Sequence, residues 1–145
     1  MHSFTIVSVN ISRDKGEKKR PVPRAEIQKG LGIVGDAHAG SGHRELSLLA
    51  VESIEKMRAA GLNAGPGDFA ENITTKGIGL CALPIGARLK LGDSIEIEIT
   101  QIGKECHSRC AIFEQAGDCV MPREGVFARI LRGGMLHAGD SGAKG

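Results

Sequence analysis

Two stretches of the chain alternate apolar and polar residues, which is the pattern of a β-strand with one buried face. The first is Thr5–Ile11 and the second, cleaner one is Ser94–Ile102. Arg88–Leu91 also alternates, and a Gly92-Asp93 turn joins it to the second stretch. These residues predict a β-hairpin whose isoleucines face the core while its glutamates and Thr100 face water.

Two other stretches have the spacing of helices. Leu46–Leu49 is interpreted as a short strand or as the lead-in to a helix, in which Ser47 caps a helix that runs through Arg58 and ends at Gly61. We expect a second helix to begin at Pro122, because proline is favoured in the first turn. The apolar face of this second helix would comprise Val126, Phe127, Ile130 and Leu131.

Composition narrows the fold class. Glycine accounts for 21 of the 145 residues, well above the usual share of ~7%, and this excess indicates many tight turns. Short strands, glycine turns and two or three short helices predict a mainly β fold, a closed or nearly closed β-barrel. A chain of this length suits one domain, so we expect residues 1–145 to form a single domain.

Charge and residue usage exclude several functions. The net charge is only +2 and the chain has no Trp or Tyr, so we expect no nucleic-acid partner. No apolar run approaches the ~20 residues of a membrane span, so we expect no membrane partner either. The four cysteines occur without an apolar leader, which predicts free thiols and a cytoplasmic protein.

Basic and glycine-rich segments in the first third of the chain offer sites for anions. Lys15–Arg24 is interpreted as a solvated loop, with a docking patch for an anionic ligand as the alternative. Gly30–Gly35 matches the dinucleotide-binding motif, but its polar flanks do not supply the strand and helix which that motif requires. The next residues bring His38, His43 and Arg44 into a glycine-rich loop, which is either an anion cradle or an ordinary polar loop.

The strongest chemical signal is a pair of cysteines directly after the best predicted strand. In the segment Lys104–Cys110, Cys106 and Cys110 have cationic neighbours, which favour the reactive thiolate form. A thiolate is also a soft metal ligand. The alternatives are buried, inert thiols or a zinc site. A zinc site would use Cys106, His107, Cys110 and Cys119. Cys81 lies in an apolar stretch and is predicted to be in the core.

Two further segments carry polar candidates. In Pro66–Ile73, the side chains of Asp68, Glu71 and Asn72 are suited to hydrogen-bonding a heterocycle or, equally, to capping the local backbone. Arg123, in the first turn of the predicted second helix, would help to bind an anion; alternatively it is solvated and paired with Glu124.

Taken in order, five segments resemble the MOSC domain, the module named for the C-terminal part of molybdenum cofactor sulfurases. The resemblance extends from about Val7 to Asp140. The segments that carry it are Gly35-Asp36-Ala37-His38, Pro66–Ile73, Leu83-Pro84-Ile85-Gly86 with Leu89 and Leu91, Gln101–Cys110, and Pro122–Phe127. The chain looks like a stand-alone, single-domain member of this family.

The resemblance implies a β-barrel that binds molybdenum cofactor (molybdopterin) and handles its sulfur. In the family a cysteine carries a persulfide sulfur or ligates molybdenum. In the amidoxime-reducing relatives this cysteine closes a Ser-Arg-Cys triplet, which here falls on Cys110. Cys106 is the second choice for the reactive thiol, or else a partner thiol to Cys110. Together with the loops described above, the implied cofactor-binding residues are His38, His43, Arg44, Glu71, Asn72, Arg109 and Arg123.

The resemblance also bears on partners. It covers the barrel module without a companion domain and without a pyridoxal-phosphate lysine motif, so pyridoxal phosphate is not expected in this domain alone. A cysteine desulfurase or a molybdoenzyme would then be the sulfur donor or acceptor. One alternative function is a small molybdenum oxidoreductase that reduces N-hydroxylated compounds with an external electron donor. The other is a non-catalytic barrel that presents Lys15–Arg24 to a protein partner.

Overall fold

The fold is taken from a computed structural model, which describes residues 3–13, 18–36, 45–61, 63–103 and 124–144. Its helical segments are the α-helix α1 (Val51–Ala59) and the 3-10 turn η2 (Leu80–Ala82). Its strands are β1 (Ser3–Ile11), β2 (Arg20–Val22), β3 (Arg24–Gln28), β4 (Gly32–Ile33), β5 (Leu46–Ala50), β6 (Ile73–Lys76), β7 (Arg88–Leu91), β8 (Ile95–Ile102), β9 (Val126–Arg132), β10 (Gly134–His137) and β11 (Ser141–Lys144).

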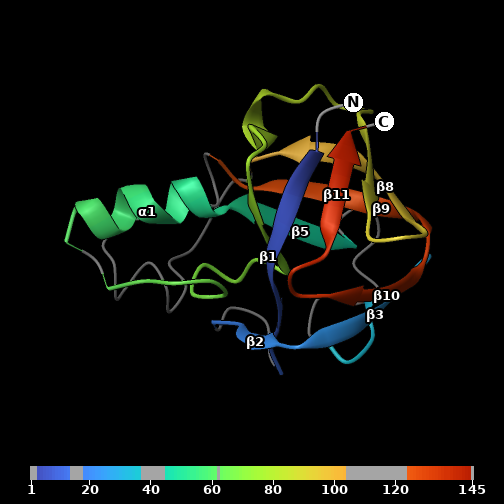
Figure 1. Cartoon of the computed structure of the whole chain (residues 1–145), viewed down its shortest axis with the longest axis horizontal. Helices are drawn as coiled ribbons and strands as arrows, with labels where there is room; N and C mark the ends of the chain where they lie inside the picture. Colours follow the sequence, from blue (N-terminus) through green and yellow to red (C-terminus); the bar gives the residue numbers. More distant parts are fainter. Residues whose placement is uncertain (1–2, 14–17, 37–44, 62, 104–123, 145) are drawn as a thin grey trace.

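Seven of the described strands close into a barrel. Their order is β11-β7-β8-β9-β5-β6-β1, and β1 pairs back onto β11, while β2 extends the sheet beyond β1 (Figure 1). β5 and β6 are parallel, and the other neighbours in the ring are antiparallel. Parallel strands need a crossover connection, and α1 lies in the crossover between β5 and β6. The predicted closed, mainly β barrel is therefore confirmed.

A small second sheet covers one end of the barrel. It has the order β10-β3-β4 and lies, with β2, at the end opposite the two chain termini in Figure 1. A Cβ on Gly134 at the start of β10 would lie only 2.7 Å from the Ser94 hydroxyl and 3.1 Å from the Ile95 side chain. Because this approach leaves no room for a side chain, β10 packs tightly across the start of β8.

The predicted hairpin forms the most regular part of the barrel wall. β7 and β8 pair around the Gly92-Asp93 turn, and Ile95, Ile97 and Ile99 are buried. The intervening glutamates lie at the half-buried outer face, where Glu98 accepts a hydrogen bond from the guanidinium of Arg129 at 2.7 Å. The period-two pattern of the sequence thus reports the two faces of this strand correctly.

Helix α1 lies outside the barrel and is held by a small apolar cluster. The cluster consists of Leu49, Ile54, Ala64, Phe69 and Phe127, and it is separate from the large cluster inside the barrel. The helix begins after Ala50 without a side-chain cap, so the predicted capping role of Ser47 is wrong: Ser47 lies within β5. None of the helices in the described ranges is long and apolar enough to cross a membrane.

The second predicted helix is also wrong over its described part. Val126, Phe127, Ile130 and Leu131 belong to strand β9, which pairs with β8 on one side and β5 on the other. Apolar side chains occupy both faces of this strand, because one face lines the barrel interior and Phe127 packs in the outer cluster. A run that is apolar on both faces loses its alternation, and this mimics a helical spacing. The predicted start, Pro122, is outside the described residues.

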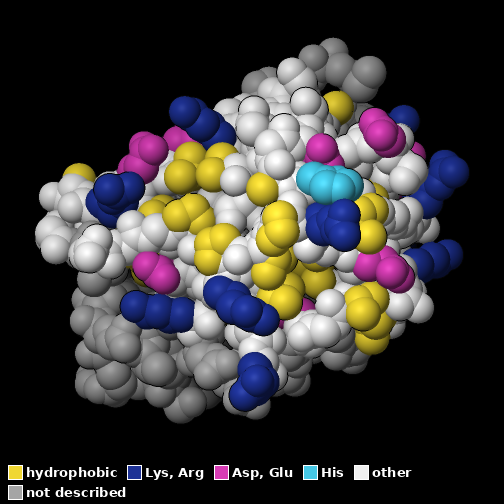
Figure 2. Space-filling view, turned by 60° about the horizontal axis from the view of Figure 1, so that its bottom comes forward, with side chains coloured by type: hydrophobic (Ala, Val, Ile, Leu, Met, Phe, Trp, Pro, Cys, Tyr) yellow, Lys and Arg dark blue, Asp and Glu magenta, His cyan; other side chains and the backbone are white. Residues whose placement is uncertain are grey.

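The basic segment Lys15–Arg24 is only partly the predicted solvated loop. Arg20–Val22 forms β2, Arg24 begins β3, and Lys19 is buried. Figure 2 shows the face on this side of the molecule, where Lys and Arg side chains are spread among hydrophobic and acidic ones and do not gather into a single patch. Burial of Lys19 removes one charge from this surface, and its partner is described below.

The seam between β1 and β11 leads to a prediction about barrel closure. Gly142 pairs with Phe4, and a Cβ at position 142 would collide with the Phe4 ring. We expect Gly142→Ala to lower the free energy of unfolding by about 1–3 kcal/mol through overpacking. Urea denaturation measures the change.

The matched control for this seam is Gly65→Ala, because a Cβ there would meet nothing within 4 Å. The control should leave the unfolding midpoint nearly unchanged. The double variant Phe4→Leu/Gly142→Ala should recover part of the loss. Equal stability of Gly142→Ala and the wild-type protein would show that the seam does not need this close approach.

Candidate functional site

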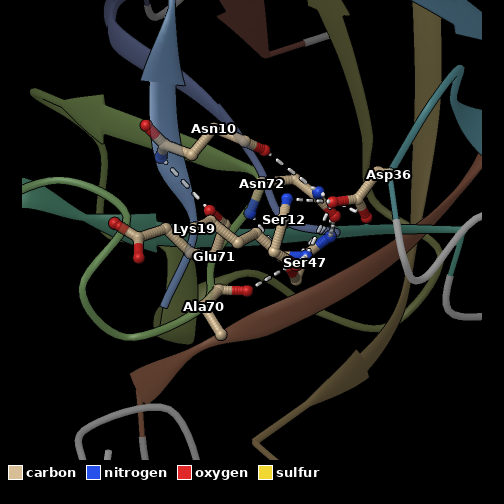
Figure 3. Close-up of polar contacts among 8 residues, drawn as sticks. All are labelled: Asn10, Ser12, Lys19, Asp36, Ser47, Ala70, Glu71 and Asn72. Atoms are coloured by element: carbon tan, nitrogen blue, oxygen red, sulfur yellow. Dashed lines mark hydrogen bonds and ion pairs between the residues drawn. The ribbon is translucent and has the colours of Figure 1, made fainter. Parts of the chain in front are cut away.

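Asn72 lies where three strands of the barrel meet. It directly precedes β6, and its backbone N–H donates to the Ser47 carbonyl of β5 at 3.0 Å. Its own carbonyl accepts the Asn10 N–H of β1 at 2.7 Å. Its side-chain Oδ1 accepts the Ser47 N–H at 3.1 Å, and its Nδ2 donates to the Asn10 carbonyl at 3.3 Å (Figure 3). Asn72 therefore joins β5 and β1 at the point where β6 enters between them.

A buried ion pair lies next to Asn72. The Lys19 ammonium is 2.7 Å from Asp36 Oδ1, and the two side chains are 0% and 2% exposed. The same carboxylate oxygen accepts the Ser12 N–H at 3.0 Å, and Asp36 Oδ2 accepts Asn72 Nδ2 at 3.1 Å. Burial by itself would raise the pKa of Asp36, but the bonds from Lys19, Ser12 and Asn72 outweigh it and hold the pKa below its usual value.

The pKa of Glu71 is shifted in the opposite direction from that of Asp36. Its Oε2 accepts the Gly67 N–H at 3.0 Å and the Thr74 hydroxyl at 2.7 Å. Its Oε1 is buried without a hydrogen-bond partner. Burial disfavours the charged form and raises the pKa of Glu71 from 4.5 to about 7, although the two hydrogen bonds act against this rise. A proton is therefore held inside the fold near neutral pH.

The segment Pro66–Ile73 thus uses its polar side chains on the backbone. Asp68 accepts the Gly65 N–H, Glu71 accepts the Gly67 N–H, and Asn72 bonds Ser47 and Asn10. This is the capping role that the sequence left open. Glu71 and Asn72 are buried at 0% and 1% exposure, so as placed neither side chain lies at the surface. Binding of a heterocycle by either residue stays a prediction.

The remaining candidate residues fall outside the described ranges. They belong to two segments, residues 37–44 and 104–123, and their predicted roles are not tested by the structure. They are His38, His43, Arg44, Cys106, His107, Arg109, Cys110, Cys119 and Arg123. Among the described residues, no group of three or more His, Cys, Asp or Glu side chains is arranged to hold a metal ion.

The residues that flank the longer segment are firmly held. Gly103 N–H donates to the Gly125 carbonyl at 2.6 Å, so the two ends of this segment lie side by side. Glu124 Oε1 accepts the Ser53 hydroxyl at 2.6 Å and the Lys56 ammonium at 3.1 Å. The first residue after the cysteine segment is thereby tied to α1.

The shorter segment has buried acidic residues at both flanks. Asp36 precedes it and Glu45 follows it, and both are buried. Glu45 Oε1 accepts the Ile130 N–H of β9 at 3.2 Å. Leu46 pairs with Ala128 and Leu48 with Val126, so Glu45 and Glu124 lie at opposite ends of β5. The barrel wall therefore holds the two candidate segments at different ends of one strand.

Cys81 is exposed, so its predicted core position is wrong. It borders a groove of about 340 Å³ that is lined by Ser53 and Lys56 of α1, by residues 77–81 and by Glu124. The stretch around Cys81 buries Leu80 and Leu83 instead. The 3-10 turn η2 rotates consecutive side chains away from each other, and the thiol faces outward.

Sequence reasoning missed the two residues that form the charged centre of this network. The sequence places Asp36 in a motif of the family without indicating a role for its side chain, and it predicts a solvated loop around Lys19. Nothing within a run of charged residues shows that one of them is buried. The burial of Lys19 depends on Asp36, which lies 17 residues away in the sequence.

Comparison with known proteins points to one family. The family model of the MOSC domain matches residues 35–141. The fold is similar to the YuaD protein from Bacillus subtilis, with a TM-score of 0.79 and 15% identity over 97% of this chain and 94% of that one. It is also similar to YiiM from Geobacillus stearothermophilus, with a TM-score of 0.75 and 18% identity over 98% and 75% of the two chains. A search of curated proteins gave no match.

The raised pKa of Glu71 predicts a pH-dependent stability. Between pH 4.5 and about 7 the unfolded chain has lost this proton while the folded protein keeps it. The contribution of Glu71 is therefore greatest at low pH and falls by about 3 kcal/mol as pH rises to 7. It becomes constant only about one pH unit above the pKa of the folded protein. Glu71→Gln should remove this decline, as urea denaturation from pH 4 to pH 9 would show.

The matched control is Glu55→Gln, which changes an exposed glutamate on α1. It should keep the wild-type pH dependence, because its carboxylate does not leave water on folding. Parallel pH profiles of wild-type protein and Glu71→Gln would contradict the assignment of this proton to Glu71.

Proposed function

Because the chain belongs to the MOSC domain family, we propose that it binds molybdenum cofactor and carries or transfers its sulfur, or ligates molybdenum, through Cys110. The family match carries this proposal, since the family is associated with that cofactor. The matched range, 35–141, contains each of the candidate site residues. The ordered motifs of the sequence support the same assignment.

Bound cofactor would supply a molybdenum held by a pterin dithiolene and a phosphate group. His38, His43 and Arg44, with Arg109 and Arg123, offer donors for the phosphate. The Cys110 thiolate is the soft ligand or the sulfur carrier. Cys106 would serve as its partner thiol.

Sulfur transfer to Cys110 needs no external oxidant. In the proposed step the Cys110 thiolate attacks the outer sulfur of a donor persulfide, a bond forms to that sulfur, and the donor thiolate leaves. A cysteine desulfurase would be the donor and a molybdoenzyme the acceptor. The cationic neighbours Lys104, His107 and Arg109 favour the attacking thiolate.

The proposal requires Cys110 to reach the end of the barrel at which residues 37–44 begin. The flanks of the two candidate segments lie at opposite ends of β5, and Leu46 to Ala50 spans about 13 Å at the usual strand rise. From Gly103 to Cys110 an extended chain reaches at most about 25 Å. The cysteine segment is therefore long enough to bring Cys110 to the end of the barrel from which residues 37–44 start.

A second candidate function is supported by the triplet Ser108-Arg109-Cys110, which matches that of the amidoxime-reducing relatives. In that case the cofactor would stay bound through turnover and would reduce N-hydroxylated compounds with electrons from a separate donor protein. An assay with a purified electron-transfer partner distinguishes the two functions, because a sulfur carrier would show no reductase turnover.

The test of the proposed function is the loss of molybdenum and sulfane sulfur from Cys110→Ala. The protein would be expressed in a host that makes the cofactor, and freshly purified samples would be analysed for molybdenum, pterin and persulfide. We expect the wild-type protein to contain them and Cys110→Ala to lose at least about nine-tenths of the molybdenum or persulfide, because Cys110 is the proposed ligand or sulfur carrier and its cationic neighbours favour the thiolate.

Cys81→Ala is the matched control, since it removes an exposed thiol that lies in the groove beside α1. It should leave both contents unchanged. Cys106→Ala tests the partner thiol separately. Negligible molybdenum and no persulfide in the wild-type protein would overturn the proposal.

A further inference from the structure

The small sheet β10-β3-β4 has an inner and an outer face. Its inner side chains, among them Ile27 and Leu136, are buried against the barrel. Side chains alternate between the two faces of a strand, so the residues between these point away from the barrel. The exposed side chains on the outer face of β3 and β10 are Arg24, Glu26, Gln28, Met135 and His137. This face therefore lies open to a partner.

Two large apolar side chains are exposed in one row across this outer face. Met135 of β10 pairs with Glu26 of β3, and from the other side the Val34 N–H donates to the Glu26 carbonyl at 3.0 Å. Met135 is 48% exposed and Val34 is 46% exposed. Figure 2 shows hydrophobic side chains through the middle of the face on this side of the molecule. Neighbouring exposed apolar side chains of this kind are typical of a contact surface.

The charges on the same face have opposite signs and lie close together. Arg24 and Glu26 are separated on β3 by the inward-facing Ala25, so they are roughly 7 Å apart along the strand. Within the described ranges, neither Arg24 nor Glu26 forms an ion pair. On β10, His137 lies beside Arg24 and Met135 lies beside Glu26. The outer face thus carries one positive and one negative charge that are available to a partner.

This pattern is complementary to itself. Consider a two-fold axis that runs parallel to the face, perpendicular to β3, at the level of Ala25. It brings each Arg24 opposite Glu26 of a second copy, and each Met135 opposite His137 of the second copy. Such a self-complementary patch is what a closed two-fold dimer requires. A purely acidic or purely basic partner would complement only one of the two charges, whereas a second copy of the chain complements both.

We propose that the outer face of the small sheet is the contact surface of a homodimer, in which β3 of one copy lies antiparallel across β3 of the other. Two ion pairs between Arg24 and Glu26 fix the direction, and Met135 and Val34 supply apolar contact area. The face is small, so the dimer should be weak, with a dissociation constant of about 1–100 μM. This inference goes beyond the proposed function and is independent of it, because no cysteine or cofactor takes part.

Sedimentation equilibrium from about 1 to 500 μM protein measures the association. The wild-type protein should change from a 15.2 kDa monomer to twice that mass as concentration rises. Arg24→Glu and Glu26→Arg each place like charges opposite one another at both contacts. Each variant should therefore raise the dissociation constant at least about a hundredfold. The double variant Arg24→Glu/Glu26→Arg exchanges the two charges and should dimerise again.

An equimolar mixture of the two single variants tests the two-fold arrangement directly. One variant is acidic at both positions 24 and 26, and the other is basic at both. Each alone should remain monomeric, whereas the mixture should form a heterodimer with attractive pairs at both contacts. The matched controls are Arg58→Glu and Glu55→Arg on α1, which change the net charge by the same amounts at exposed positions of another surface. They should leave the dissociation constant of the dimer unchanged.

The proposal is overturned if the wild-type protein stays monomeric at the highest concentration, which would leave the face to a different protein partner or to none. It is equally overturned if the wild-type protein dimerises and the reversals at positions 24 and 26 have no effect, because the dimer then uses another surface. Monomeric single variants whose mixture also stays monomeric would contradict the antiparallel arrangement. Thermal unfolding near the wild-type midpoint verifies that each variant is folded.

Discussion

Strands β5 and β6 are parallel, so the chain must leave the barrel after Ala50, pass along α1 and enter again beside the strand it left. The point of re-entry is Asn72. Its peptide groups and side-chain amide bond both Ser47 and Asn10, and they do so in the buried wall of the barrel. Buried polar groups are costly without partners. The register of β6 with both neighbours therefore depends on this residue.

The same junction explains why a barrel with an apolar interior also contains a buried charge pair. Asn72 Nδ2 reaches Asp36, and Asp36 requires Lys19 to remain ionised away from water. Removal of any one member would leave a buried partner unsatisfied. The network therefore acts as one unit that joins the end of β1, the start of β6 and the residue that precedes segment 37–44.

The residues that form the barrel and the residues proposed to bind cofactor belong to different parts of the chain. The described residues form the closed barrel and the polar junction, and the residues proposed to bind cofactor and to carry sulfur belong mainly to two connecting segments. Binding and catalytic residues are often carried by loops that a rigid scaffold positions. In this protein, Asp36, Glu45, Gly103 and Glu124 are the points at which the scaffold holds those segments.

The sequence by itself determined the strands that have one apolar face and one polar face. It also determined the family. The β7–β8 hairpin follows from alternating residues, because one face is apolar and the other meets water. The ordered motifs identified the MOSC resemblance and, with it, Cys110 as the candidate thiol. Strand β9, the exposed thiol of Cys81 and the burial of Lys19 were decided only by the tertiary structure. For β9 and Lys19 the environment comes from residues distant in sequence, because the outer cluster covers Phe127 and Asp36 neutralises Lys19 across the fold; Cys81 is turned outward by the 3-10 turn η2. Local patterns record how residues alternate along the chain, and they contain no information about which distant partner will cover or neutralise a side chain.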